Sequence, residues 1–98
     1  MIIVRNTFRL KFGKAKDAQA LVKEAIAINK KLGIPNARAM MDLTGESYTL
    51  VFETGHQSLS DFEKNLKTVF ASEEWAAMYQ KMIPLVDSAH RDIFTVVE

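Results

Sequence analysis

Asn6 is the residue of this sequence whose chemistry is hardest to explain by folding alone. It is the only polar member of one side of an alternating segment, which otherwise holds Ile2, Val4, Phe8, Leu10 and Phe12. A buried side-chain amide that finds no hydrogen-bond partner costs about 1–3 kcal/mol. Asn6 therefore bonds to a neighbouring backbone group or a water, or it faces a cavity and orients the carbonyl or hydroxyl group of a ligand.

A second set of candidates lies on a predicted helix near residue 75. Trp75, Met78, Tyr79 and Met82 repeat at helical spacing and form one stripe. Such a stripe is usually core, but Trp and Tyr carry polar groups and methionine adapts to irregular cavities. A ligand held by this stripe would be flat and mostly apolar. The predicted ligand-binding residues are Asn6, Phe8, Phe62, Trp75, Met78 and Tyr79.

The two histidines are predicted to be loop residues. His56 follows the expected third strand and His90 precedes the fourth; because these strands run parallel, the histidines lie at opposite ends and cannot share a metal within one subunit. His90, near Asp87 and Asp92, has the chemistry of a general base, although spacing alone is a weak signal. The chain has no cysteine and no G-x-S-x-G, P-loop, G-x-G-x-x-G or H-E-x-x-H motif. No catalytic residue, cofactor or metal site is therefore predicted.

The composition limits the chain to one small domain and excludes several classes of function. Its 98 residues, 48% of them apolar, are enough for one hydrophobic core but not for two domains. Thirteen basic and twelve acidic residues leave a formal charge of +1, so no strong field favours nucleic acid or a membrane as partner. No apolar run reaches the length of a signal peptide or a membrane span, and we expect a cytoplasmic protein.

The spacing of apolar residues predicts the element order β-α-β-β-α(α)-β. Alternation is typical of strands, and apolar residues three and four apart are typical of helices. A turn around Gly45 makes the second and third strands a hairpin, and Gly55 is expected to end it. The predicted elements are a strand at 2–12, a helix at 14–32, strands at 36–43 and 48–53, helices at 59–70 and 72–82, and a strand at 91–97.

This order is that of the split βαβ or ferredoxin-like fold, an α+β class. We expect one such domain over residues 1–98, a four-stranded antiparallel sheet with helices on one face. The other face mixes charged residues with large apolar ones, which is unusual for a face that meets only water. A second subunit is therefore expected to cover it; the alternative is an open monomeric sheet. The predicted interface residues, with the charged ones as candidate pairs across it, are Arg5, Arg9, Met40, Asp42, Val51 and Glu53.

Three segments carry a resemblance to a known family: VRNTFRLKFGK at 4–14, SEEWAAMYQKMIPL at 72–85 and RDIF at 91–94. The whole chain resembles the dimeric α/β-barrel superfamily, in which two ferredoxin-like subunits pack sheet to sheet, and within it the NIPSNAP-like proteins. More distantly it resembles antibiotic-biosynthesis-type monooxygenases and haem-degrading enzymes, which have an asparagine at the place of Asn6. Where the haem-degrading branch has a tryptophan and a histidine, this chain has Phe62 and Tyr79, so haem degradation is not expected.

Fold analogy cannot supply a function, and three interpretations stay open. The first is a homodimeric domain that binds a small apolar or aromatic metabolite between sheet and helices. The second is a cofactor-independent monooxygenase-like enzyme in which Asn6 orients the substrate. The third is a structural or interaction protein with a filled core. A cavity of a few hundred Å³ between sheet and helices favours the first two, and a closed core favours the third.

Overall fold

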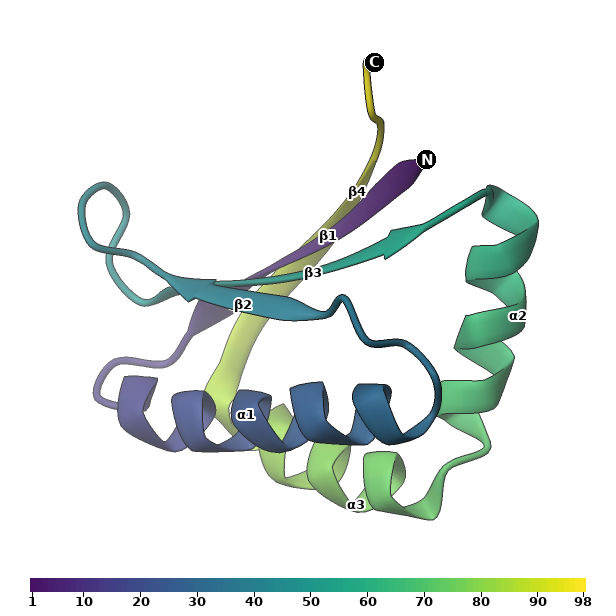
Figure 1. The fold of residues 1–98 in the computed structure, drawn as a ribbon. Coiled ribbons are helices and arrows are strands. Elements are labelled where there is room, and N and C mark those ends of the chain that lie inside the picture. Colours follow the sequence, from purple (N-terminus) through teal and green to yellow (C-terminus); the bar gives the residue numbers. More distant parts are fainter.

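The computed structural model describes residues 1–98 and has the predicted order of elements. The strands are β1 (Ile2–Leu10), β2 (Arg38–Met41), β3 (Thr49–His56) and β4 (Val86–Thr95); the helices are α1 (Ala15–Lys31), α2 (Leu59–Phe70), α3 (Glu73–Met82) and the short 3-10 helix η1 (Ile83–Leu85). The predicted ferredoxin-like α+β fold is confirmed, with one four-stranded antiparallel sheet and its helices on one face (Figure 1).

The sheet has the strand order β2-β3-β1-β4, so the first strand of the chain is central and the last is at an edge. β1 runs antiparallel to both neighbours, and Ile2 pairs with His56 on one side and with Thr95 on the other. Both chain ends therefore lie at the same end of the sheet (Figure 1). Helices α1 and α3 lie side by side below one sheet face, and α2 stands beyond the end of β3 (Figure 1).

Local sequence signals mark the starts of α2 and α3 and the end of α1. The Ser58 and Ser72 hydroxyls accept hydrogen bonds from the backbone N–H groups of Asp61 and Trp75, each at 3.2 Å, and so cap α2 and α3. The predicted break between these helices is confirmed, and the second cap gives α3 its own direction. Gly33, with a φ of +87°, follows the end of α1. None of these helices has the length and apolar character needed to cross a membrane.

The hydrophobic core lies between the sheet and the pair α1 and α3. Leu50 in β3 has no exposed surface and Val4 in β1 is 1% exposed. Leu50 belongs to a cluster of ten buried residues from β1, α1, β3, α3 and η1. This cluster is Leu10, Ala18, Val22, Ala25, Ile28, Leu50, Phe52, Met78, Met82 and Leu85.

Two strands end earlier than predicted. β1 ends at Leu10, and the backbone N–H of Lys14 donates to the Lys11 carbonyl in the turn that follows. Phe12, predicted to continue the apolar face, is 89% exposed. β2 ends at Met41, because the chain turns at Asp42, whose carboxylate accepts a hydrogen bond from the Thr49 N–H at 3.0 Å. Alternation alone does not locate these turns.

The other two strands extend further than predicted. Gly55, expected to end β3, lies within it, and a Cβ there would be 3.0 Å from the Asn36 amide nitrogen. That nitrogen donates to the Gly55 carbonyl at 2.9 Å, so the glycine allows a close approach and does not mark a turn. β4 begins at Val86 and not at residue 91, although it ends at Thr95 and not at residue 97. The prediction of His56 and His90 as loop residues was therefore wrong, since both lie in strands.

Candidate functional site

A cavity of about 530 Å³ lies between the sheet and the helices. Of the 23 residues that line it, 16 are hydrophobic, so its walls are mostly apolar. Val4 and Leu50 cover it from the sheet, and Val22 and Ala25 of α1 form part of the opposite wall. A volume of this size is typical of small-molecule sites. By the criterion given above, a space of this size favours the two ligand-binding interpretations over a filled core.

All six residues predicted to contact a ligand line this cavity. Met78 is buried and belongs to the core cluster, whereas Tyr79 is 51% exposed. The stripe on α3 therefore serves both as core and as cavity wall. The six residues are Asn6 and Phe8 on β1, Phe62 on α2, and Trp75, Met78 and Tyr79 on α3.

The mouth of the cavity lies between β4 and the two helices α2 and α3. The lining residues that are exposed to solvent all come from these three elements, whereas those from α1, β1 and β3 are buried or half-buried. The exposed ones are Phe70, Tyr79, Ala89, His90 and Arg91. A ligand would therefore enter past β4, with its far end towards the sheet and α1.

Asn6 has a defined partner at this mouth. Its side-chain oxygen accepts a hydrogen bond of 2.9 Å from Nε of Arg91, which lies across from it in β4. The Arg91 guanidinium also lies over the Phe62 ring, with its central carbon 5.5 Å from the ring centroid. These two contacts hold Arg91 in place on the cavity side of the sheet.

His56, the last residue of β3, lies in the cavity wall next to α2. Its Nδ1 is 2.9 Å from the Asn65 amide nitrogen and its Nε2 is 2.8 Å from the Thr54 hydroxyl oxygen. A neutral ring with its proton on Nε2 satisfies both contacts. Burial lowers the pKa of His56 below its ordinary value of 6.5, although the charge of Asp61 opposes this shift. Both ring nitrogens therefore have partners, and the ring packs beside Phe62, with their centroids 5.1 Å apart.

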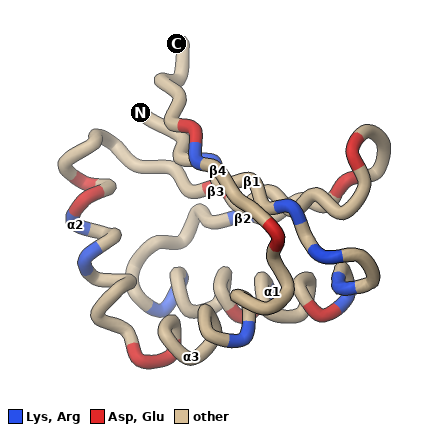
Figure 2. Tube along the Cα trace, turned by 180° about the vertical axis from the view of Figure 1, so that it is seen from behind, with Lys and Arg blue, Asp and Glu red and all other residues tan.

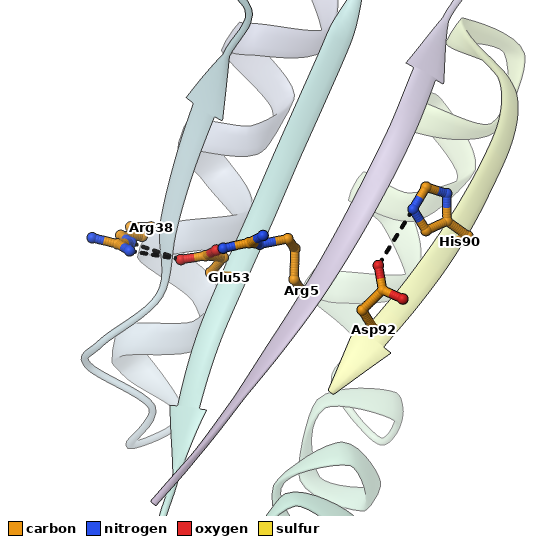
Figure 3. A network of polar contacts seen from close by, with 5 residues as sticks. All are labelled: Arg5, Arg38, Glu53, His90 and Asp92. Carbon is orange, nitrogen blue, oxygen red and sulfur yellow. Dashed lines mark hydrogen bonds and ion pairs between the residues drawn. The ribbon is translucent and has the colours of Figure 1, made fainter. Parts of the chain in front are cut away.

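The face of the sheet away from the helices carries a buried carboxylate between two arginines (Figure 3). Glu53 is 2% exposed; one of its oxygens is 2.5 Å from Arg5 Nε and the other is 2.9 Å from Arg38 Nε. Burial alone would raise the pKa of Glu53, but the hydrogen bonds and charges of Arg38 and Arg5 outweigh it and lower the pKa below 4.5. Arg5 and Glu53, expected as partners across an interface, pair within one chain.

The remaining predicted interface residues lie on this same outer face. Arg9 pairs with Glu46, and the Asp42 carboxylate accepts from the Thr49 N–H. Met40 is 39% exposed and stands opposite the half-buried Val51. The charged members therefore have partners inside the chain, and the apolar ones remain in part open to solvent.

Comparisons with known proteins identify the family of this chain and solved structures that share its fold. The family model of NIPSNAP matches residues 5–98, which include β4 and all of the cavity-lining residues except Val4. The chain belongs to the NIPSNAP family. A NIPSNAP family protein from Agrobacterium tumefaciens superimposes with a TM-score of 0.90 at 21% identity, covering 99% of this chain and 86% of that one. An uncharacterized NIPSNAP domain protein from Burkholderia xenovorans gives 0.85 at 17% identity, covering 99% and 95%.

A further neighbour shares the fold outside the NIPSNAP family. It is a putative antibiotic biosynthesis monooxygenase from Nitrosomonas europaea, with a TM-score of 0.77, 7% identity and full coverage of both chains. Identities this low show the fold alone. No curated protein sequence matches the chain.

Sequence reasoning missed several residues of this NIPSNAP cavity. Asn29 falls three and four residues after Ile26 and Ala25, so helical periodicity places it on the apolar stripe of α1, and it is 3% exposed. Its amide donates to the Ala25 carbonyl at 2.9 Å. Arg91 and His56 gave no comparable signal, because their places depend on strand pairing with β1. No group of three or more His, Asp or Glu side chains is placed to hold a metal ion.

Proposed function

We propose that this NIPSNAP-family chain forms a homodimer that binds a small apolar or aromatic metabolite in the cavity between its sheet and its helices. The observation that carries the proposal is the cavity itself, about 530 Å³ with 16 hydrophobic residues among the 23 that line it. Aromatic side chains from two helices, Phe62 on α2 and Trp75 on α3, lie in its walls and suit a flat guest. A few polar groups, among them Asn6, supply orientation.

Filling the cavity from α1 should weaken ligand binding. Ala25 lines the cavity at 4% exposure, so in Ala25→Phe the added ring occupies the space of the ligand. We expect the neutral dye Nile red to bind the unaltered protein and to bind this variant at least about tenfold more weakly. Fluorescence titration gives both affinities, and circular dichroism shows that the variant is folded.

The matched control is Ala27→Phe, the same change on the exposed side of α1. It should leave the dye affinity unchanged. Equal binding by the two variants, or no binding by the unaltered protein, would contradict a ligand site in this cavity.

The outer sheet face supports the homodimer. It presents the partly exposed Met40 and Phe94 beside charged groups that already have partners. A second copy would therefore cover apolar surface without leaving a buried charge unpaired. We expect light scattering to give about twice the chain mass of 11.1 kDa. Val51→Lys places a new charge in the middle of this face and should give the single-chain mass. A monomer before substitution, or a dimer that tolerates it, would refute this interface.

A further inference from the structure

The charges of the cavity lining restrict the chemical class of the ligand more than the shape of the cavity does. None of the 23 lining residues is an aspartate or a glutamate. Two of the three basic lining residues are histidines: the pKa of His56 is lowered, and His90 Nε2 is 3.4 Å from Asp92 on the outer face. Arg91 is therefore the one permanently charged side chain of the lining.

Arg91 has no acidic partner in the structure. Its Nε donates to Asn6, and its central carbon lies over the Phe62 ring, so the side chain is held without losing its charge. A guanidinium has five N–H donors, and no other hydrogen bond or ion pair of the Arg91 side chain is formed inside the chain. The four donors of its two terminal nitrogens therefore have no partner in the chain, and a guanidinium presents such donors as the fork that binds carboxylates.

Asn6 adds donors at the same place. Because its oxygen accepts from Arg91, its amide N–H groups are the part of the side chain left for a ligand. Two neighbouring side chains thus both offer unused N–H donors, which suit an oxygen atom with negative charge. Elsewhere basic and acidic residues are interspersed along the chain (Figure 2), so this preference is local to the mouth and does not come from a basic surface.

We propose that the ligand is an amphipathic carboxylic acid, whose carboxylate binds Arg91 and Asn6 at the mouth and whose apolar body fills the cavity. This inference rests on the proposed ligand-binding function and adds the chemical class of the ligand. The apolar body lies against the buried walls, and the charge remains at the rim beside β4, where water still reaches it. Desolvation of the carboxylate is therefore small.

The test is displacement of Nile red by two nearly isosteric compounds, naphthoic acid and naphthamide, at neutral pH. We expect the acid to bind roughly tenfold more tightly than the amide, because a charge-assisted pair with arginine is stronger than a neutral hydrogen bond. Arg91→Gln should remove this preference while Nile red still binds. Asn6→Asp should also remove it, because the new carboxylate becomes the partner of Arg91 and repels the ligand.

Lys67→Gln is the matched control, since it removes one positive charge from the exposed side of α2. It should keep the preference for the acid. Equal binding of acid and amide to the unaltered protein, or a preference that survives both variants at the mouth, would overturn the carboxylate site and leave the proposed function standing. Failure of Nile red to bind at all would overturn the proposed function as well.

Discussion

Replacing Leu50 by alanine is expected to lower the free energy of unfolding by about 3 kcal/mol, within the range for buried leucines. Leu50 has no exposed surface and stands in β3 between Phe8 of β1 and Met41 of β2. It also borders the cavity, so the atoms removed would enlarge an existing space that the sheet cannot close. For a domain near 100 residues this loss corresponds to a fall in Tm of roughly 12–24 °C.

Urea denaturation at one fixed protein concentration measures this change, because any self-association would make the stability depend on concentration. Leu43→Ala is the matched control: the same atoms are removed from a side chain that is 97% exposed. Its effect should stay within about 0.5 kcal/mol. A loss below about 1 kcal/mol for Leu50→Ala would show that the core does not depend on this position.

Replacing Glu53 by glutamine should cost about 2 kcal/mol of folding free energy at neutral pH. Removing one member of a buried charge cluster usually costs more, but Arg5 and Arg38 are partly exposed and regain water when the carboxylate is lost. The glutamine amide also turns a donor towards an arginine that needs an acceptor. Glu46→Gln is the matched control, because its pair with Arg9 lies at the surface and should contribute less than about 1 kcal/mol.

The pH dependence of this difference follows from the lowered pKa of Glu53. A carboxyl group whose pKa is lower in the folded than in the unfolded state stabilises the fold fully above the unfolded value. Its contribution disappears as the pH falls below 4.5 and through the folded value. The stability gap between the unaltered protein and the Glu53→Gln variant should therefore be full at neutral pH and close in acid. A gap that stays constant down to acid pH would contradict the ionised, arginine-bound state.

The fold could be predicted because its signals are local. Alternation and helical spacing depend on near neighbours, and the caps at Ser58 and Ser72 depend on residues three positions away. The ends of the strands were less predictable. Residues 86–90 of β4 are held by pairing with β1 and are mostly exposed, so they show no apolar alternation. Gly55 resembles a turn residue in the sequence because its role depends on Asn36, nineteen residues away.

The cavity residues show the same difference between local signals, which the sequence reveals, and contacts between distant residues, which it does not. Asn6 stands out because a polar residue interrupts an apolar face, and the stripe of α3 because of its period. Arg91 could not be assigned to the cavity in this way, since its contact with Asn6 joins residues at opposite ends of the chain. Which basic side chain reaches the mouth is set by the register between β1 and β4, and one sequence does not reveal that register.

The central position of β1 has a consequence for how the protein is made. β1 is synthesised first, but its partners are β3 and β4, and Ile2 pairs with Thr95 near the end of the sheet. Contacts so distant in sequence form slowly, because the entropy of closing a long loop is lost before the contacts can stabilise the chain. On the ribosome β1 therefore emerges long before either neighbour, and its apolar residues stay uncovered meanwhile. Native sheet assembly, and with it the cavity mouth beside β4, completes only once β4 has emerged.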